Sequence, residues 1–160
     1  MLMRPAMSES SLIAIADRLL ATTGASRTTI RLDRPDAVFP IVAESVAPGV
    51  PSLLGGRGVG DLRAAKTFQW LDRERRVLVQ DELERADPAP PAELIRAYGA
   101  KAQMLAPVLE GERLAGIVSV HQSGGPRAWT DADVQAIEQA AQDVLRELGE
   151  GGLIRDRRTR

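Results

Sequence analysis

Side chains able to do chemistry are few in this sequence. The chain of 160 residues has no cysteine and one histidine, His121. The lack of thiols excludes disulfides, thiolate nucleophiles, and zinc or iron–sulfur sites held by cysteine. One histidine likewise excludes a metal site built from several histidines of the same chain. We therefore expect no catalytic residues, no bound metal and no cofactor.

His121 is the first candidate for a binding role. It ends a predicted strand, and strand alternation places it on one face with Ser119 and Ile117. On that face the imidazole and the Ser119 hydroxyl are able to hydrogen-bond a ligand, and Met104 on the preceding strand is a further candidate. A simpler interpretation is a strand-end histidine bonded to a loop carbonyl or to water. Acid–base catalysis by His121 is the least favoured interpretation, because no nucleophile or second acid is identifiable beside it.

Aromatic and basic side chains supply the remaining candidates. Phe68, Trp70 and Tyr98 are three of the five aromatic residues, and all lie in segments expected to cover a pocket. Ligand sites combine apolar walls with a few polar groups, but packing of these rings against a sheet explains them equally well. Arg63 and Lys66 lie one turn apart on a predicted short helix and are able to meet an anion. A solvated helix face is the simpler interpretation of that pair.

Periodicity predicts the elements that position these side chains. A first helix is predicted over residues 8–21, with Ser8 or Ser10 as its N-cap. Short apolar or alternating runs predict strands over residues 28–32, 41–46, 77–79, 104–109 and 114–120. Short helices are predicted over residues 62–71 and 92–98. Antiparallel strands framed by helices at both ends of the chain predict an α+β fold.

The final helix, predicted over residues 131–148, has the clearest start. Thr130 is its predicted N-cap, and Asp133 three residues later completes a capping box with the shorter acid. Gly149 is predicted to end the helix. The folded domain is then residues 8–149, between a flexible N-terminus (1–7) and a disordered basic tail (150–160).

Charge and composition limit the expected partners. A formal net charge of −1 argues against a nucleic-acid-binding protein, which usually carries a basic face. Aromatic residues make up only 3% of the chain, which leaves few rings for stacking on bases. No apolar run approaches the roughly 20 residues that span a bilayer, and no secretory signal is recognisable at the start. We expect a cytoplasmic protein with no nucleic-acid or membrane partner.

The amino-acid sequence of two segments resembles that of the GAF domain, a small-molecule-sensing relative of the PAS fold. The segment MLAPVLEGERLAGIVSV (104–120) is similar to the family's hairpin, and WTDAD (129–133) to the entry of its last helix. The resemblance covers residues 8–148. It implies a central antiparallel sheet of five or six strands, with the terminal helices on one face. Loops and short helices would enclose a pocket on the other face.

The resemblance implies ligand binding and signalling rather than catalysis. It implies a small organic or anionic metabolite bound between the sheet and residues 49–98, with a signalling protein or an enzyme reading the bound state. A homodimer through the terminal helices is also implied, with Ile13, Ala136 and Ala140 extending their apolar edges. Packing within one chain explains those three residues equally well. The alternative function is a protein–protein interaction module of the same fold with a collapsed pocket.

Three known activities of the family meet obstacles in this sequence. Members that attach a bilin do so through cysteine, and members that reduce free methionine sulfoxide also use cysteines. This chain has none. Members that bind cyclic nucleotides often carry an Asn-Lys-Phe-Asp-Glu signature, which is not found here, so a cyclic nucleotide is unsupported.

Overall fold

The secondary structure follows the predicted order. The structure is a computed structural model that describes residues 9–54 and 62–159, with residues 150–159 described as backbone only. Its elements are α1 (Glu9–Thr23), β1 (Arg27–Leu32), β2 (Ile41–Val46), α2 (Lys66–Glu74), β3 (Leu78–Gln80), α3 (Ala92–Tyr98), β4 (Ala100–Glu110), β5 (Arg113–Ser123) and α4 (Asp131–Thr159). Single 3-10 turns at Leu62–Ala64 and Leu83–Arg85 precede α2 and α3. The segment predicted as one short helix over 62–71 is therefore a 3-10 turn followed by an α-helix.

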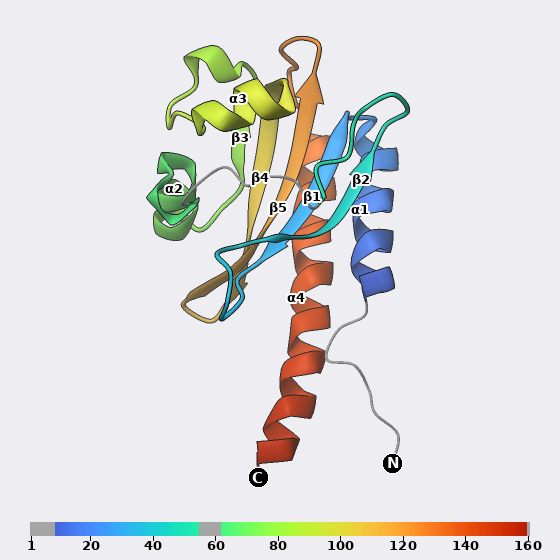
Figure 1. Cartoon of the computed structure of the whole chain (residues 1–160), viewed down its shortest axis with the longest axis vertical. Coiled ribbons are helices and arrows are strands. Elements are labelled where there is room, and N and C mark those ends of the chain that lie inside the picture. The colour runs from blue at the N-terminus through green and yellow to red at the C-terminus, as the bar shows by residue number, and fades with distance from the viewer. Residues whose placement is uncertain (1–8, 55–61, 160) are drawn as a thin grey trace.

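The five described strands form one antiparallel sheet in the order β2-β1-β5-β4-β3. Helices α1 and α4 cover one face, and α2 and α3 lie on the other (Figure 1). This arrangement confirms the predicted α+β fold. The face under α1 and α4 buries one large apolar cluster, whereas the other face buries two smaller apolar clusters together with a row of polar side chains, and this row locates the candidate site.

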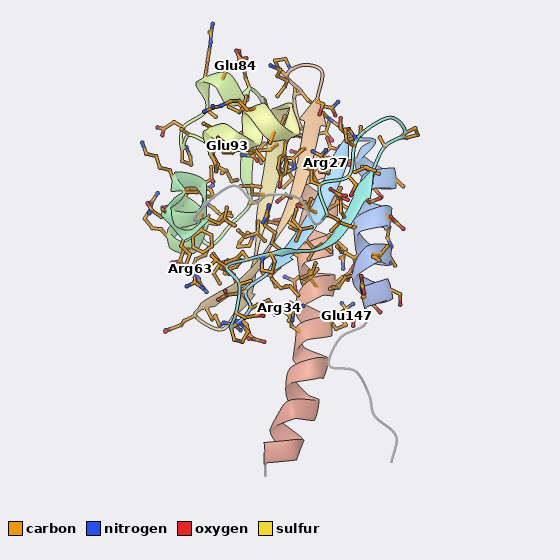
Figure 2. The ribbon with its side chains drawn as sticks, viewed as in Figure 1. Arg27, Arg34, Arg63, Glu84, Glu93 and Glu147 are labelled. Carbon is orange, nitrogen blue, oxygen red and sulfur yellow. The ribbon has the colours of Figure 1, made fainter. Side chains whose placement is uncertain are left out.

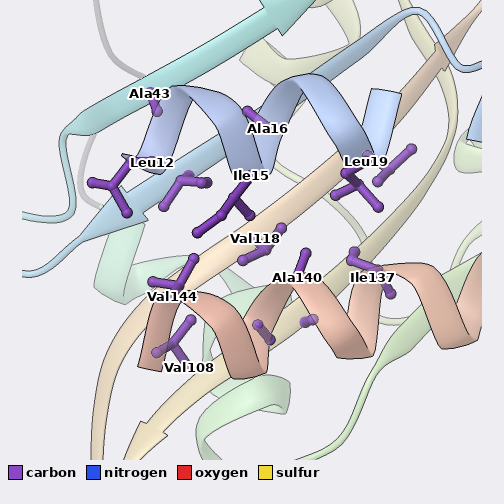
Figure 3. Close-up of a cluster of buried hydrophobic side chains, with 14 of the residues drawn as sticks. Leu12, Ile15, Ala16, Leu19, Ala43, Val108, Val118, Ile137, Ala140 and Val144 are labelled. Atoms are coloured by element: carbon purple, nitrogen blue, oxygen red, sulfur yellow. The ribbon is translucent and has the colours of Figure 1, made fainter. Parts of the chain in front are cut away.

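The face under the terminal helices is mainly apolar, and its buried Thr28 donates a hydrogen bond to the Ala16 carbonyl of α1. Helices α1 and α4 run antiparallel across it (Figure 3). The buried side chains drawn there include Leu12, Ile15, Leu19, Val108, Val118, Ile137, Ala140 and Val144. Burying each large aliphatic side chain contributes about 1.5–3 kcal/mol, so this face is the main hydrophobic core. Met104 belongs to this core, where it pairs across the strands with Val120.

The start of α4 is as predicted. The Asp133 amide donates to Thr130 Oγ1 at 3.1 Å, and the Thr130 amide donates to Asp133 Oδ2 at 3.0 Å. These reciprocal bonds satisfy two backbone donors at a helix start that would otherwise lack partners. The capping box is therefore confirmed.

The prediction that α4 ends at Gly149 is wrong, because the helix runs to Thr159. A glycine ends a helix when it takes a left-handed conformation, and the φ of Gly149 is not in that region. Glycine inside a helix costs only about 1 kcal/mol relative to alanine, so the helix is able to pass through it.

One of the two predicted N-cap residues of α1 is wrong. Helix α1 begins at Glu9, so Ser10 lies inside the helix and is not its N-cap. Ser8, the other predicted cap, lies outside the described residues.

In the described ranges no helix combines the length and the apolar character needed to cross a membrane.

Gly116 lets the central strands approach closely. A Cβ atom built on it would lie 2.6 Å from the carbonyl oxygen of Arg31 and 2.7 Å from a methyl group of Leu32. Both contacts are shorter than packed atoms tolerate. A glycine is therefore required where β5 passes β1.

Candidate functional site

A row of buried polar side chains crosses four strands on the face opposite the terminal helices. Arg27 on β1 is the register partner of His121 on β5, which pairs with Gln103 on β4. Gln103 in turn pairs with Gln80 on β3. None of the four is more than 5% exposed. Buried polar groups destabilise a fold unless they find partners, so the partners of this row decide whether it is structural.

Hydrogen bonds satisfy the row only in part. Gln103 Nε2 donates to Gln80 Oε1 at 2.8 Å, and Gln80 Nε2 donates to the Pro88 carbonyl at 2.7 Å. Among the described residues, Arg27 Nε and Nη1, Gln103 Oε1 and His121 Nδ1 are buried without a hydrogen-bond partner. Each such atom costs about 1–3 kcal/mol. Four of them along one row need partners that the described side chains do not supply, such as water or a bound molecule.

Arg27 is the charged side chain of the row, and it is 2% exposed. Its Nη2 donates to the Pro51 carbonyl at 2.9 Å, and its Nε lies 3.5 Å from Glu44 Oε2. The Glu44 carboxylate also accepts from Ser52 Oγ at 2.5 Å and from the Leu53 amide at 2.9 Å. Burial lowers the pKa of Arg27, while the Glu44 carboxylate acts in the opposite direction. Glu44 is thus shared between Arg27 and the loop after β2.

Tyr98 contacts all three basic side chains of the site. Gly99, with φ of 61°, ends α3 and leaves Tyr98 as the last helical residue over the sheet. The Arg27 guanidinium carbon lies 5.0 Å from the centre of the tyrosine ring, within cation–π range. The His121 ring packs edge-on against it at 5.6 Å, and the tyrosine hydroxyl accepts from Arg31 Nη2 at 2.9 Å.

His121 is neutral in this surrounding. Burial, followed by the positive charges of Arg27 and Arg31, lowers its pKa to about 3. A neutral imidazole carries one donor and one acceptor nitrogen. His121 is therefore suited to hydrogen-bond a ligand and unsuited to exchange protons near neutral pH.

A small cavity lies against the row. Its volume is about 40 Å³. The lining residues are Arg31, Thr67, Pro91, Leu94, Tyr98, Gln103, Leu105, Ile117, Ser119 and His121. Such a space admits a water molecule, whereas pockets for organic ligands measure about 300–1,000 Å³. An organic ligand therefore requires the side chains over the cavity, Tyr98 among them, to move.

Three of the seven predicted site residues meet at this cavity. Tyr98, Ser119 and His121 all line it, as strand alternation and the position of α3 suggested. Met104 does not, because it points into the core under α1 and α4. The role of these residues in binding stays a prediction.

Of the other three predicted residues, Phe68 and Trp70 lie on α2 and Arg63 lies in the 3-10 turn before it. Phe68 packs edge-on against Phe39, with ring centres 4.9 Å apart. Trp70 is partly buried, and the Arg76 guanidinium lies 4.9 Å from its ring centre. Arg63, which Figure 2 shows beside α2 and away from Arg27, makes an ion pair with Asp33 at 2.8 Å. Packing and surface charge account for the described contacts of these three residues.

Six polar residues of the site were not predicted from the sequence: Arg27, Arg31, Glu44, Thr67, Gln80 and Gln103. A signal was present for two of them, because Arg27 and Arg31 have the same parity on one strand and so share a face. Assigning that face to the site requires the pairing of β1 with β5, which is not visible in either strand.

Two residues of the predicted dimer seam line the groove between the terminal helices. Ala136 and Ala140 line it together with Ile15 and Leu19 of α1, and its volume is about 230 Å³. Ala140 is only 4% exposed, whereas Ile13 on α1 is 38% exposed. Ala140 therefore packs within the chain, Ala136 is partly exposed in the groove, and Ile13 faces outward, so the dimer seam stays a prediction.

Comparison with known proteins adds the family to this description. The family model described as GAF domain matches residues 9–148. The blue-light-absorbing form of the PixJ GAF domain of Thermosynechococcus elongatus is 19% identical, with a TM-score of 0.75 over 94% of this chain and 90% of that chain. The photoproduct state of GAF3 from Slr1393 of Synechocystis sp. PCC6803 is 21% identical, with a TM-score of 0.70 over 92% and 98% of the two chains. No curated protein sequence matches.

Proposed function

The chain belongs to the GAF domain family, and from this premise we propose that it is a sensory module that binds a small organic molecule. The proposed site lies between the sheet and helices α2 and α3, over the row from Arg27 to Gln80. The bound state would be read by a partner protein in the cytoplasm.

One observation carries this proposal. Four buried polar atoms without hydrogen-bond partners lie on three neighbouring strands, and two of the residues that carry them, Gln103 and His121, line a cavity. A face that served only for packing would have apolar side chains there, as the face under α1 and α4 has. Polar groups kept buried and unpaired are typical of sites whose partner is a ligand.

The contacts of the site also supply a route for the signal. Tyr98 ends α3, while Glu44 holds Ser52 and the Leu53 amide in the loop after β2. A ligand that competes for Tyr98 or Arg27 would change the order of α3 and of this loop. The partner would then read a change in surface shape.

Some of the structurally similar GAF domains bind bilins, and two features of this chain argue for a different ligand. One is described as the phycoerythrobilin-bound GAF domain from a cyanobacterial phytochrome, and it is 20% identical with a TM-score of 0.72. This chain has no cysteine for a thioether bond, and its cavity of about 40 Å³ is far smaller than a bilin. We therefore propose a smaller ligand that is bound without a covalent bond.

A thermal-shift screen of the 160-residue chain against central metabolites, with calorimetry on each hit, tests the proposal. We expect a hit whose affinity falls in the Ser119→Ala variant and is unchanged in Ser123→Ala, a matched change at the end of the same strand and outside the residues that line the cavity. A library without a single hit, or hits that ignore Ser119, would overturn it.

The alternative function is a protein–protein interaction module of the same fold. The small volume of the cavity favours it. A pull-down from native extract separates the two functions, because a stable partner retained with and without metabolites supports the interaction module. A partner whose binding changes with a hit from the screen supports the sensor.

A homodimer through the terminal helices is part of the proposal. Its support is the exposed Ile13 on α1. Light scattering during size-exclusion chromatography measures the mass directly. We expect a dimer that Ile13→Glu converts to a monomer, and a monomeric native chain would contradict this expectation.

A further inference from the structure

The ring of Tyr98 contacts the three basic side chains of the site, and two of them, Arg27 and His121, carry unpaired atoms. It stacks on the guanidinium of Arg27, contacts the edge of His121 and accepts a hydrogen bond from Arg31. The side chain is 6% exposed, so these contacts are shielded from solvent. A flat ring with an oxygen at one end is therefore the shape that this site already holds.

The charges around that ring are unbalanced. Arg27 shares Glu44 with the loop after β2. Arg31 has no ion-pair partner in the described part of the chain, and its printed hydrogen bonds go to two neutral oxygens, the Phe39 carbonyl and the Tyr98 hydroxyl. Two guanidinium groups thus face one carboxylate. Burial, and after it the positive charges of both arginines, keep His121 neutral by lowering its pKa.

An ionised oxygen would satisfy this site better than the phenol does. A hydrogen bond from a guanidinium to a carboxylate is shorter and stronger than one to a neutral hydroxyl. A carboxylate oxygen at the position of the Tyr98 hydroxyl would gain that difference from Arg31. The unpaired N–H groups of Arg27 are further donors on the same side of the sheet.

We infer that the ligand is a flat organic carboxylate that takes the place of the Tyr98 ring. Its ring stacks on Arg27, its carboxylate binds Arg31, and Tyr98 leaves the site together with the end of α3. Tyr98 is thus an internal stand-in for the ligand, and its displacement is the event that changes α3. This inference rests on the proposed function, because it specifies the ligand of the same site.

The test uses two probes of one shape, benzoate and its neutral isostere benzamide, in calorimetry on the full chain. The variant Tyr98→Ala removes the stand-in ring. We expect it to bind benzoate about tenfold more tightly than benzamide, since only benzoate makes a charge-assisted hydrogen bond. We also expect the native chain to bind benzoate more weakly than this variant does, because the native chain must first displace Tyr98.

A second pair of variants assigns the preference to Arg31. Adding Arg31→Met to Tyr98→Ala is expected to abolish the preference for benzoate. Adding Arg34→Met, which removes an exposed arginine in the following turn, is expected to leave the preference unchanged. Should Tyr98→Ala fail to fold, Tyr98→Phe removes only the hydroxyl that Arg31 contacts. We expect Tyr98→Phe to bind benzoate more tightly than the native chain.

The outcomes separate this inference from the proposed function. Benzamide binding as tightly as benzoate, a preference that survives Arg31→Met, or no benzoate binding to any variant would overturn the inference. Neutral hits in the metabolite screen that depend on Ser119 would support the sensor function and contradict the inference that its ligand is a carboxylate. A benzoate preference with no metabolite hit would instead leave the anion site standing without the sensor function.

Discussion

Arg27 and His121 are register partners on adjacent strands, so two buried basic side chains lie side by side. The pair is tolerated because one member is neutral. Arg27 keeps its charge beside Glu44, whereas His121 has a pKa lowered to about 3. The site therefore holds two buried basic side chains but only one positive charge from them, because Arg27 is protonated and His121 is not.

Stability is expected to fall in acid because of His121. Its native pKa of about 3 lies below the ordinary value of 6.5. Between these two pH values His121 is protonated in the unfolded chain but not in the native chain. The stability that comes from a neutral His121 is complete above pH about 6.5 and is lost as the pH falls toward about 3. Between about pH 7.5 and about pH 5 the loss is about 2 kcal/mol.

Urea unfolding at the two pH values measures this loss of stability. The variant His121→Gln cannot be protonated at this position, so we expect it to lose less stability between the two pH values than the native chain does. The chain has one histidine, so its NMR signal is directly assignable. We expect the imidazole shift to stay constant down to about pH 5. A titration midpoint near 6.5 in the native protein would contradict the prediction.

Removing the charge of Glu44 is expected to destabilise the fold strongly. Glu44→Gln leaves Arg27, whose side chain is 2% exposed, without its carboxylate, and breaking a buried ion pair costs about 3–5 kcal/mol. The matched control is Glu110→Gln, which breaks an exposed pair with Arg113 and is expected to cost less than about 1 kcal/mol. Equal losses in urea unfolding would show that Arg27 does not depend on Glu44.

Gly116→Ala is expected to lower stability by about 1–3 kcal/mol, because the new methyl group meets the Arg31 carbonyl and a Leu32 methyl group. Gly125→Ala is the control, since no atom lies within 4 Å of its added carbon and its φ is not in the left-handed region. Thermal unfolding of both variants measures the difference. Two variants of equal stability would mean that β1 moves away from β5 without penalty.

Thr130→Ala is expected to cost about 1 kcal/mol, because it removes the side-chain half of the capping box at the start of α4. The same substitution at Thr22, an exposed position inside α1, is expected to change stability by less than about 0.5 kcal/mol. Chemical denaturation of the two variants checks the pair. A Thr130→Ala variant as stable as Thr22→Ala would show that the cap is dispensable.

Features that depend on neighbours in the chain were predictable. Thr130 and Asp133 are three residues apart, and their reciprocal bonds need only the first turn of a helix. The β4–β5 hairpin turns at Gly111, whose φ is 64°, between two strands whose apolar runs were recognisable. Ser119 and His121 share a face because side chains alternate along any strand.

The end of α4 was not predictable from its residues. Glycine is able either to continue a helix or to end it in a left-handed conformation. Gly149 continues it. Neither conformation is excluded by the sequence around it, so the spacing of glycines predicted the wrong end.

The sequence by itself determined the order of the elements, the capping box, and the absence of cysteine chemistry. The tertiary structure alone decided that Arg27 lies beside His121 and that Met104 faces the terminal helices. The physical reason is that backbone geometry sets which residues of one strand share a face. Which face is covered, and which residues meet across strands distant in the chain, is set by packing the whole sheet against its helices.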